Sequence, residues 1–163
     1  MSRMSEFEVR AVEASVTFPL RRAVLGARPN EPNLENMARP DDADPDSGHF
    51  AVLDETEAVI GTGTVRRQAA PWSPQETGYQ IRGMAVAPEL WGRGIGTAML
   101  AAIICHVETR EGGLLRCQAR IRAQRLYARA EFLTHGEPFV DESSGKQVNM
   151  YRQVLQRSPS IDL

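Results

Sequence analysis

Seven stretches of the chain show either alternation of apolar and polar residues or a short apolar run, and both patterns predict β-strands. Three other stretches place apolar residues three or four positions apart, which predicts helices with one apolar face. The predicted strands cover residues 7–12, 49–53, 58–65, 79–87, 114–119, 132–140 and 147–154, and the predicted helices cover residues 17–25, 94–110 and 122–130. Thr17 is the expected N-cap of the first helix, with Pro19 in its first turn and Gly26 as its stop signal.

The order of these elements, β-α-β-β-β-α-β-α-β-β, predicts the α+β (or α/β) class, with a central mixed sheet flanked by helices. The helix at 94–110 joins two strands, and such a connection predicts that they are parallel and linked by a right-handed crossover. We expect a single domain over residues 1–155, followed by a short tail at 156–163, because a chain of 163 residues suits one core.

The composition excludes some classes of binding partner but does not identify an activity. The formal net charge is −2 and the hydrophobic fraction is 42%, so we expect no general attraction to nucleic acid or to a membrane surface. No uninterrupted apolar run is long enough to span a bilayer, and Cys105 and Cys117 are expected as buried free thiols. We therefore expect a cytoplasmic protein. The three histidines are scattered with no metal-ligand spacing, so no metal is expected.

The stretch from Gly83 to Ala102 has the strongest chemical signal. A strand ends at Pro88, three glycines follow at Gly92, Gly94 and Gly96, and a helix then begins. Glycines let a ligand approach the main chain, and the first amides of a helix have no intrahelical acceptor, so this turn favours a phosphate or pyrophosphate. The spacing matches neither the lysine-bearing P-loop nor the G-x-G-x-x-G fingerprint of dinucleotide-binding folds.

Trp91-Gly92-Arg93-Gly94-Ile95-Gly96 resembles the acetyl-CoA motif Q/R-x-x-G-x-G/A of the GNAT superfamily of N-acetyltransferases, with Trp91 at the position of the usual Gln or Arg. The order of elements is also that of the GNAT fold, so the resemblance covers nearly the whole chain. It implies that the central strand pairs with the pantetheine amides and that the turn binds pyrophosphate through main-chain N–H groups. The residues implied to bind acetyl-CoA are Met84, Ala85, Val86, Trp91, Gly92, Arg93, Gly94, Ile95, Gly96, Thr97 and Ala123.

A second stretch, residues 120–132, resembles the GNAT element N-x-x-A-x-x-x-Y-x-x-x-G-F. Ala123, Tyr127 and Phe132 match, whereas Arg120 replaces Asn and Glu131 replaces Gly. The missing Asn removes one expected contact to the pantetheine arm, and the missing Gly changes how the helix ends. The resemblance implies that Tyr127 is the catalytic acid that protonates the leaving thiolate, and a phenol with a reference pKa of about 10 is protonated at neutral pH.

The general base and the acceptor are left open by the sequence. The central strand carries Arg82 and no Glu, so the candidates for the base are His49, Glu89 or a chain of waters, and Cys117 is a further candidate as an acyl carrier. The acidic segment from Glu31 to Asp46 is expected as a solvated loop, with attraction of a cationic amine as the alternative. The implied partner is a small-molecule or peptide amine, and dimers are common in the superfamily, so a homodimer is possible.

Three functions are compatible with these residues. The first is transfer of an acetyl group from acetyl-CoA to a primary amine by direct attack. The second is a non-catalytic acyl-CoA-binding or sensing protein on the same fold, to which the missing strand carboxylate and the altered second motif point. The third is a different nucleotide-binding enzyme, which predicts stabilisation by NAD or ATP and not by acetyl-CoA.

Overall fold

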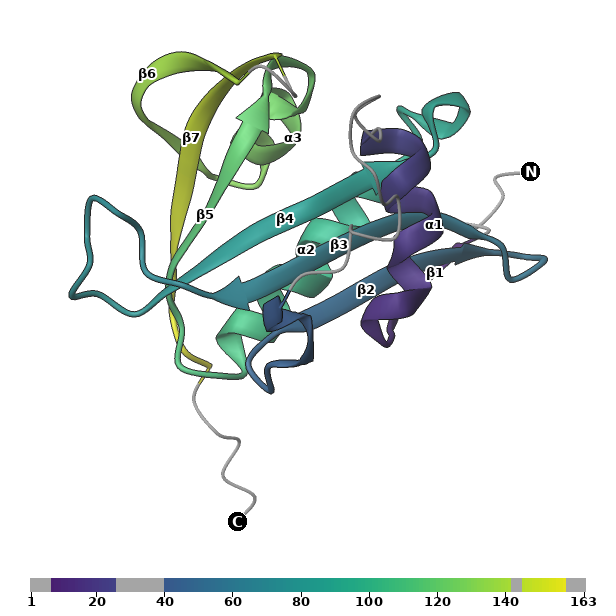
Figure 1. The fold of residues 1–163 in the computed structure, drawn as a ribbon, viewed down its shortest axis with the longest axis horizontal. Helices are drawn as coiled ribbons and strands as arrows, with labels where there is room; N and C mark the ends of the chain where they lie inside the picture. The colour runs from purple at the N-terminus through teal and green to yellow at the C-terminus, as the bar shows by residue number, and fades with distance from the viewer. Residues whose placement is uncertain (1–6, 26–39, 142–144, 158–163) are drawn as a thin grey trace.

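A computed structural model describes residues 7–25, 40–141 and 145–157 of the chain. These residues form a seven-stranded sheet in the order β1-β2-β3-β4-β5-β7-β6 (Figure 1). The strands are β1 (Phe7–Ala11), β2 (Gly48–Asp54), β3 (Val59–Arg67), β4 (Gly78–Val86), β5 (Gly113–Arg120), β6 (Leu133–Asp141) and β7 (Gly145–Val154). All seven predicted strands are present, and the mixed sheet of the predicted fold class is confirmed.

Three α-helices flank the sheet, as predicted: α1 (Ala14–Leu25), α2 (Ile95–Glu108) and α3 (Gln124–Arg129). The described residues also include three short 3-10 helices that were not predicted: η2 (Pro40–Ala43), η3 (Pro88–Leu90) and η4 (Ile121–Ala123). In Figure 1, α1 lies in front of the sheet and α2 behind it. Side-chain contacts agree, because Thr64 of β3 bonds to Arg21 of α1, whereas its neighbour Gly63 faces Met99 of α2. The α2 face carries the main apolar core.

The predicted N-cap of the first helix was wrong. Helix α1 begins at Ala14, so Thr17 and Pro19 both lie inside it. The Thr17 side chain is fully buried, and its hydroxyl donates to the carbonyl oxygen of Ala14 at 2.7 Å. Thr17 therefore satisfies its hydroxyl inside the helix, as Thr does when it bonds back to the preceding turn. Helix α1 ends at Leu25, and Gly26, the predicted stop signal, lies outside the described residues.

The crossover through α2 has the predicted geometry, since β4 and β5 are parallel. Every other neighbouring pair in the sheet is antiparallel. Met99, Leu100, Ile103 and Val107 of α2 are fully or almost fully buried, because the apolar stripe at helical spacing packs on the sheet. No helix among the described residues is long and apolar enough to cross a membrane.

Candidate active site

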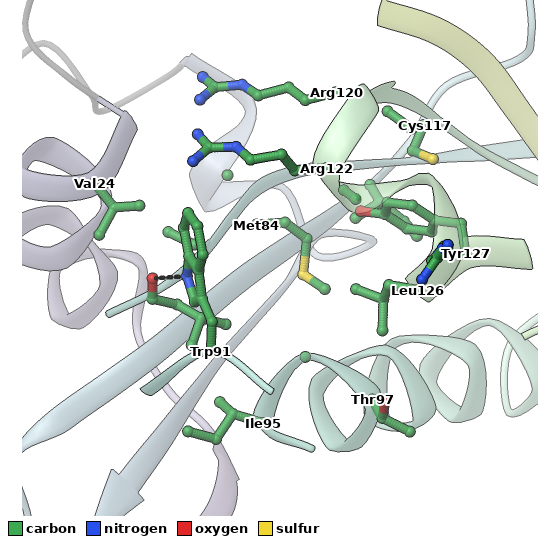
Figure 2. A pocket seen from close by; sticks show the side chains of 18 of the residues that line it. Val24, Met84, Trp91, Ile95, Thr97, Cys117, Arg120, Arg122, Leu126 and Tyr127 are labelled. Carbon is green, nitrogen blue, oxygen red and sulfur yellow. Dashed lines mark hydrogen bonds between the residues drawn. The ribbon is translucent and has the colours of Figure 1, made fainter. Parts of the chain in front are cut away.

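A cleft opens where β4 and β5 separate. The two strands pair over only three residues near their starts, from Gly78↔Leu114 to Gln80↔Arg116, and then diverge. Beyond that point β5 pairs with β7 along its whole length, so the gap lies on one side of β5 only. The cleft has a volume of about 1000 Å³ and is lined by β4, the glycine turn, the start of α2, β5, η4 and α3 (Figure 2).

A bulge in β4 accompanies this separation. The register between β3 and β4 shifts between Thr62, which faces Ala85, and Thr64, which faces Arg82. Gly83 lies at the bulge with a φ of 65°, and a Cβ there would come within 2.9 Å of the Arg21 Nε. Both the left-handed backbone and the contact with α1 therefore require glycine.

The glycine turn exposes main-chain amides to the cleft. Gly92 and Gly94 have φ values of 83° and 82°, and nothing lies within 4 Å of a Cβ added to either residue. Gly94 is the N-cap of α2, and the amide of Ala98 donates to its carbonyl oxygen at 3.0 Å. That bond is the first of the helix, so the amides of residues 95–97 have no intrahelical acceptor. The turn can bind an anion through these groups.

The predicted acetyl-CoA residues largely come together at this cleft. All of them except Arg93 belong to its lining: Met84, Ala85, Val86, Trp91, Gly92, Gly94, Ile95, Gly96, Thr97 and Ala123. Arg93 is exposed on the turn and lies outside the lining. Gly96 packs against α3, because a Cβ there would lie 3.1 Å from a methyl group of Leu126. The glycine spacing thus also sets how closely α2 and α3 approach.

Trp91 joins the two sides of the cleft at its mouth. Its indole N–H donates to the carbonyl oxygen of Val86 at 2.9 Å, which fixes the ring against the end of β4 (Figure 2). The guanidinium of Arg122, from η4 on the opposite side, lies 4.6 Å from the centre of the same ring. Trp91 is 48% exposed, so this cation–π contact is solvated and weak, worth about 0.5–1 kcal/mol.

Tyr127 lies inside the cleft, where its hydroxyl donates to the thiol of Cys117 on β5. The tyrosine is 3% exposed, and its ring packs edge-on against Phe132. Burial, and after it the Cys117 thiol, raises the pKa of Tyr127 well above its ordinary value. Burial also raises the pKa of Cys117 to about 12, against the smaller opposing effect of the Tyr127 hydrogen bond. Both groups are therefore neutral at physiological pH.

A neutral thiol of this kind is a poor nucleophile, which weighs against Cys117 as an acyl carrier. The two predicted candidates for a general base also lie elsewhere. His49 is buried on β2 and bonds through both ring nitrogens, to the Thr64 hydroxyl at 3.0 Å and to the Asp42 carbonyl at 2.8 Å. Glu89 is exposed on η3, outside the cleft lining. The residue type of His49 suits a general base, but β2, the strand that carries it, does not line the cleft.

The sequence analysis missed several polar residues of the cleft, among them Asp141 at the end of β6 and Gln147 on β7. Gln147 faces Arg120 in the register of β5 and β7, and this pairing brings it to the cleft. Only the strand order, with β7 between β5 and β6, could have revealed them. Among the described residues, no group of three His, Cys, Asp or Glu side chains could hold a metal ion.

Comparison with known proteins identifies the family. Residues 17–132 match the model of the acetyltransferase (GNAT) family. The chain belongs to the GNAT family. A relative from Bacillus subtilis, the uncharacterized N-acetyltransferase YitI, is 25% identical over 149 residues, which cover 89% of this chain and 95% of YitI.

Solved structures of other GNAT acetyltransferases share the fold. The phosphinothricin acetyltransferase of Sinorhizobium meliloti, solved in complex with acetyl-CoA, superposes with a TM-score of 0.71 at 18% identity, over 93% of this chain and 90% of that one. The spermidine N-acetyltransferase SpeG of Vibrio cholerae, solved with CoA and spermine, has a TM-score of 0.63 at 17% identity, over 91% of this chain and 96% of that one. The predicted GNAT fold and family are confirmed, and membership supports acyl transfer.

Proposed function

We propose that this GNAT protein transfers an acetyl group from acetyl-CoA to a primary amine of a small molecule or peptide. One observation carries the proposal: residues 95–97, whose amides have no helical acceptor, and Tyr127 line a single cleft. The amides suit the pyrophosphate of the coenzyme. The cleft between them and Tyr127, at about 1000 Å³, is roomy enough for a pantetheine arm and an amine.

The chemistry needs no covalent intermediate on the protein. The amine nitrogen attacks the thioester carbonyl carbon, a C–N bond forms, and the C–S bond breaks to release a thiolate. The amine loses one proton to solvent, Tyr127 gives its proton to the leaving sulfur, and the phenolate then regains a proton from solvent. The raised pKa of Tyr127 keeps the phenol protonated throughout the physiological range, so it has a proton for that sulfur, although it is a weaker acid than an exposed phenol. Main-chain groups of β4, from Met84 to Val86, would hold the pantetheine as an added strand.

Binding and turnover test the proposal separately. Calorimetry with acetyl-CoA, NAD and ATP should show association with acetyl-CoA alone. A coenzyme-release assay across a panel of amines should then show turnover. Binding of NAD or ATP in place of acetyl-CoA would contradict the proposal. Binding of acetyl-CoA with no turnover on any amine would instead favour a non-catalytic acyl-CoA-binding protein, since neither His49 nor Glu89 reaches the cleft.

The Tyr127→Phe variant tests the acid. We expect kcat to fall about 100-fold, which is typical of losing a general acid, while the Kd of acetyl-CoA changes less than about threefold. Tyr79→Phe is the matched control, because Tyr79 is equally buried and lies outside the cleft lining. Unchanged turnover in Tyr127→Phe would remove the acid role from Tyr127.

A further inference from the structure

The side of the cleft formed by β5 and β7 carries a set of side chains that the chemistry above does not use. Cys117 and Ala119 of β5 pack in the core beside Tyr127, so Arg120, next along the strand, projects from the opposite face. Gln147 faces Arg120 across the β5–β7 ladder and therefore shares that face. Both side chains line the cleft, Arg120 from β5 and Gln147 from β7.

A small basic hollow joins the cleft at this place. It has a volume of about 200 Å³ and is lined by Arg120, Ile121, Arg122 and Lys146. Arg120 and Arg122 line the large cleft as well, so the two spaces share a wall. In Figure 2 the guanidinium groups of Arg120 and Arg122 point the same way, toward the side of the cleft on which Val24 of α1 lies. We call this space, with its three cationic residues Arg120, Arg122 and Lys146, the basic hollow.

Among the described residues, no acidic side chain forms an ion pair with the cations of the basic hollow. Within the described residues, Arg120 and Lys146 make no ion pair, and Arg122 has only its contact with the Trp91 ring. Some surface arginines elsewhere in the protein do pair, as Arg10 does with Glu8 and Arg157 with Glu108. Three cations around one small space repel one another, and a bound anion would relieve that repulsion.

Acidic side chains are scarce in the cleft itself. Asp141 is the only carboxylate among the described residues that line it, whereas five arginines do so: Arg82, Arg120, Arg122, Arg125 and Arg129. The described part of the acidic segment points elsewhere, since Asp42 lies 3.9 Å from Arg21 and Asp46 lies 3.9 Å from Arg67. This charge distribution disfavours a polycationic acceptor and favours an anionic one.

Gln147 adds an observation independent of charge. It is 4% exposed, it lines the cleft, and its side-chain oxygen has no hydrogen-bond partner. A buried amide oxygen without a partner costs free energy, and an N–H group of a ligand would satisfy it. An amine is such a donor, and it would lie beside the basic hollow.

We propose that the acceptor amine also carries a carboxylate, which Arg120 and Lys146 bind while Gln147 accepts a hydrogen bond from the amine. This inference rests on the proposed acetyl transfer and names its substrate class. Arginine matches a carboxylate with two parallel hydrogen bonds, so Arg120 should contribute most to the recognition. Arg122 lies against Trp91 of the glycine-turn side and is not assigned to the carboxylate.

The test compares amino acids with carboxamides that lack only this charge, and with a polycationic amine. The purified protein is assayed with α-, β- and γ-amino acids, with their carboxamides, and with spermidine, and the kcat/KM of each acceptor is measured. We expect the best amino acid to exceed its own carboxamide at least tenfold in kcat/KM. Turnover of carboxamides or spermidine as good as, or better than, that of the amino acids would overturn the inference but would leave acetyl transfer intact. No coenzyme release with any amine would overturn acetyl transfer itself.

Variants show whether the basic hollow binds the carboxylate of the acceptor or the phosphates of the coenzyme. In Arg120→Gln the preference for the amino acid should fall below about threefold, with the KM of acetyl-CoA changed less than twofold, and Arg120→Lys should restore part of the preference. Lys146→Gln should act in the same direction with a smaller effect. Arg10→Gln, on the exposed edge strand β1, is the control for removal of one positive charge. A rise in the KM of acetyl-CoA with an unchanged acceptor preference would assign the basic hollow to the coenzyme and overturn the inference.

Discussion

The two walls of the cleft differ in what they present to a ligand. The wall formed by β4 and the start of α2 offers main-chain groups, because glycines occupy the turn and the first amides of α2 have no helical acceptor. The wall formed by β5, β7 and α3 offers side chains, among them Arg120, Tyr127 and Gln147. Main-chain groups do not change with the sequence, so the first wall suits a ligand group that all substrates share. Side chains do change with the sequence, so the second wall suits a ligand group that differs between substrates.

This difference explains where the chain can depart from its family's pattern. Trp91 replaces the usual Gln or Arg in the turn, yet the backbone geometry of Gly92 and Gly94 is independent of that side chain. On the second wall a replaced side chain changes the chemistry directly. Arg120, at the position of the usual Asn, brings a positive charge into the cleft and is central to the proposed acceptor site.

The largest effect should come from changing the backbone of the first wall. Gly94→Ala places a Cβ on a residue with a φ of 82°, where nothing crowds it, so the change acts through conformation alone. An L-residue loses roughly 1–2 kcal/mol in this left-handed region, and the turn can relax by moving the amides of residues 95–97. We expect the Kd of acetyl-CoA, measured by calorimetry, to rise about 10- to 100-fold.

Gly136→Ala is the matched control for that variant. Gly136 lies on β6, has a φ of 73°, has nothing within 4 Å of an added Cβ and is outside the cleft lining. It should lose similar stability and leave the Kd of acetyl-CoA unchanged. Equal weakening of binding by both variants would show that loss of stability, and not the geometry of the turn, controls affinity.

The sequence predicted the first wall much better than the second. Its signals are local: three glycines, a proline that ends the strand and a helical stripe lie within twenty consecutive residues, from Gly83 to Ala102. The amides that matter follow from these positions alone, because any helix leaves its first amides without acceptors. Tyr127 was also predicted, through the spacing of a second local motif.

The rest of the second wall depends on contacts between distant parts of the chain. Gln147 reaches the cleft only because β7 inserts between β5 and β6, and no pattern near Gln147 encodes that order. The same limit explains why the sequence left His49 among the candidates for the base. Its residue type suits a base, but the hairpin of β2 and β3 directs the ring to Thr64 and to the Asp42 carbonyl.

An intermediate effect should come from the thiol on the second wall. Cys117→Ala removes the group to which Tyr127 donates but leaves the tyrosine in the cleft, so direct transfer should continue. We expect kcat to change less than about fivefold in the coenzyme-release assay. Cys105→Ala, which removes the other, half-buried thiol, is the control. Loss of turnover confined to Cys117→Ala would indicate an acyl-enzyme and contradict direct attack.

The same variant should alter the alkaline stability of the protein. The pKa of Cys117 is about 12 in the folded protein and near 9 when exposed, so above about pH 9 the unfolded chain loses this proton first. The contribution of the thiol to stability is therefore complete below pH 9 and declines as pH rises toward 12. The Tm of the parent protein should fall more steeply between pH 9 and 10.5 than that of Cys117→Ala. Parallel curves would contradict the raised pKa.

The smallest effect concerns the end of α3, where Glu131 replaces the family's glycine. Glu131 has a φ of 69°, and its amide donates to the Ala128 carbonyl while the amide of Phe132 donates to Tyr127, both at 3.0 Å. These bonds form a Schellman motif whose left-handed residue is a glutamate, so the helix ends as it would with glycine but with backbone strain. The replacement of glycine by Glu131 therefore affects stability but does not move Tyr127.

Glu131→Gly should relieve that strain. We expect the free energy of unfolding to rise by about 1 kcal/mol, seen as an increase in Tm of about 2–4 °C, because the left-handed conformation costs glycine little. Glu131→Ala retains a Cβ and should give no such gain, which separates backbone strain from removal of the charge. Turnover should change less than twofold in both variants, since Glu131 is exposed and outside the cleft lining. A glycine variant that gains stability but loses turnover would mean that the strain at Glu131 helps to hold Tyr127 in its working position.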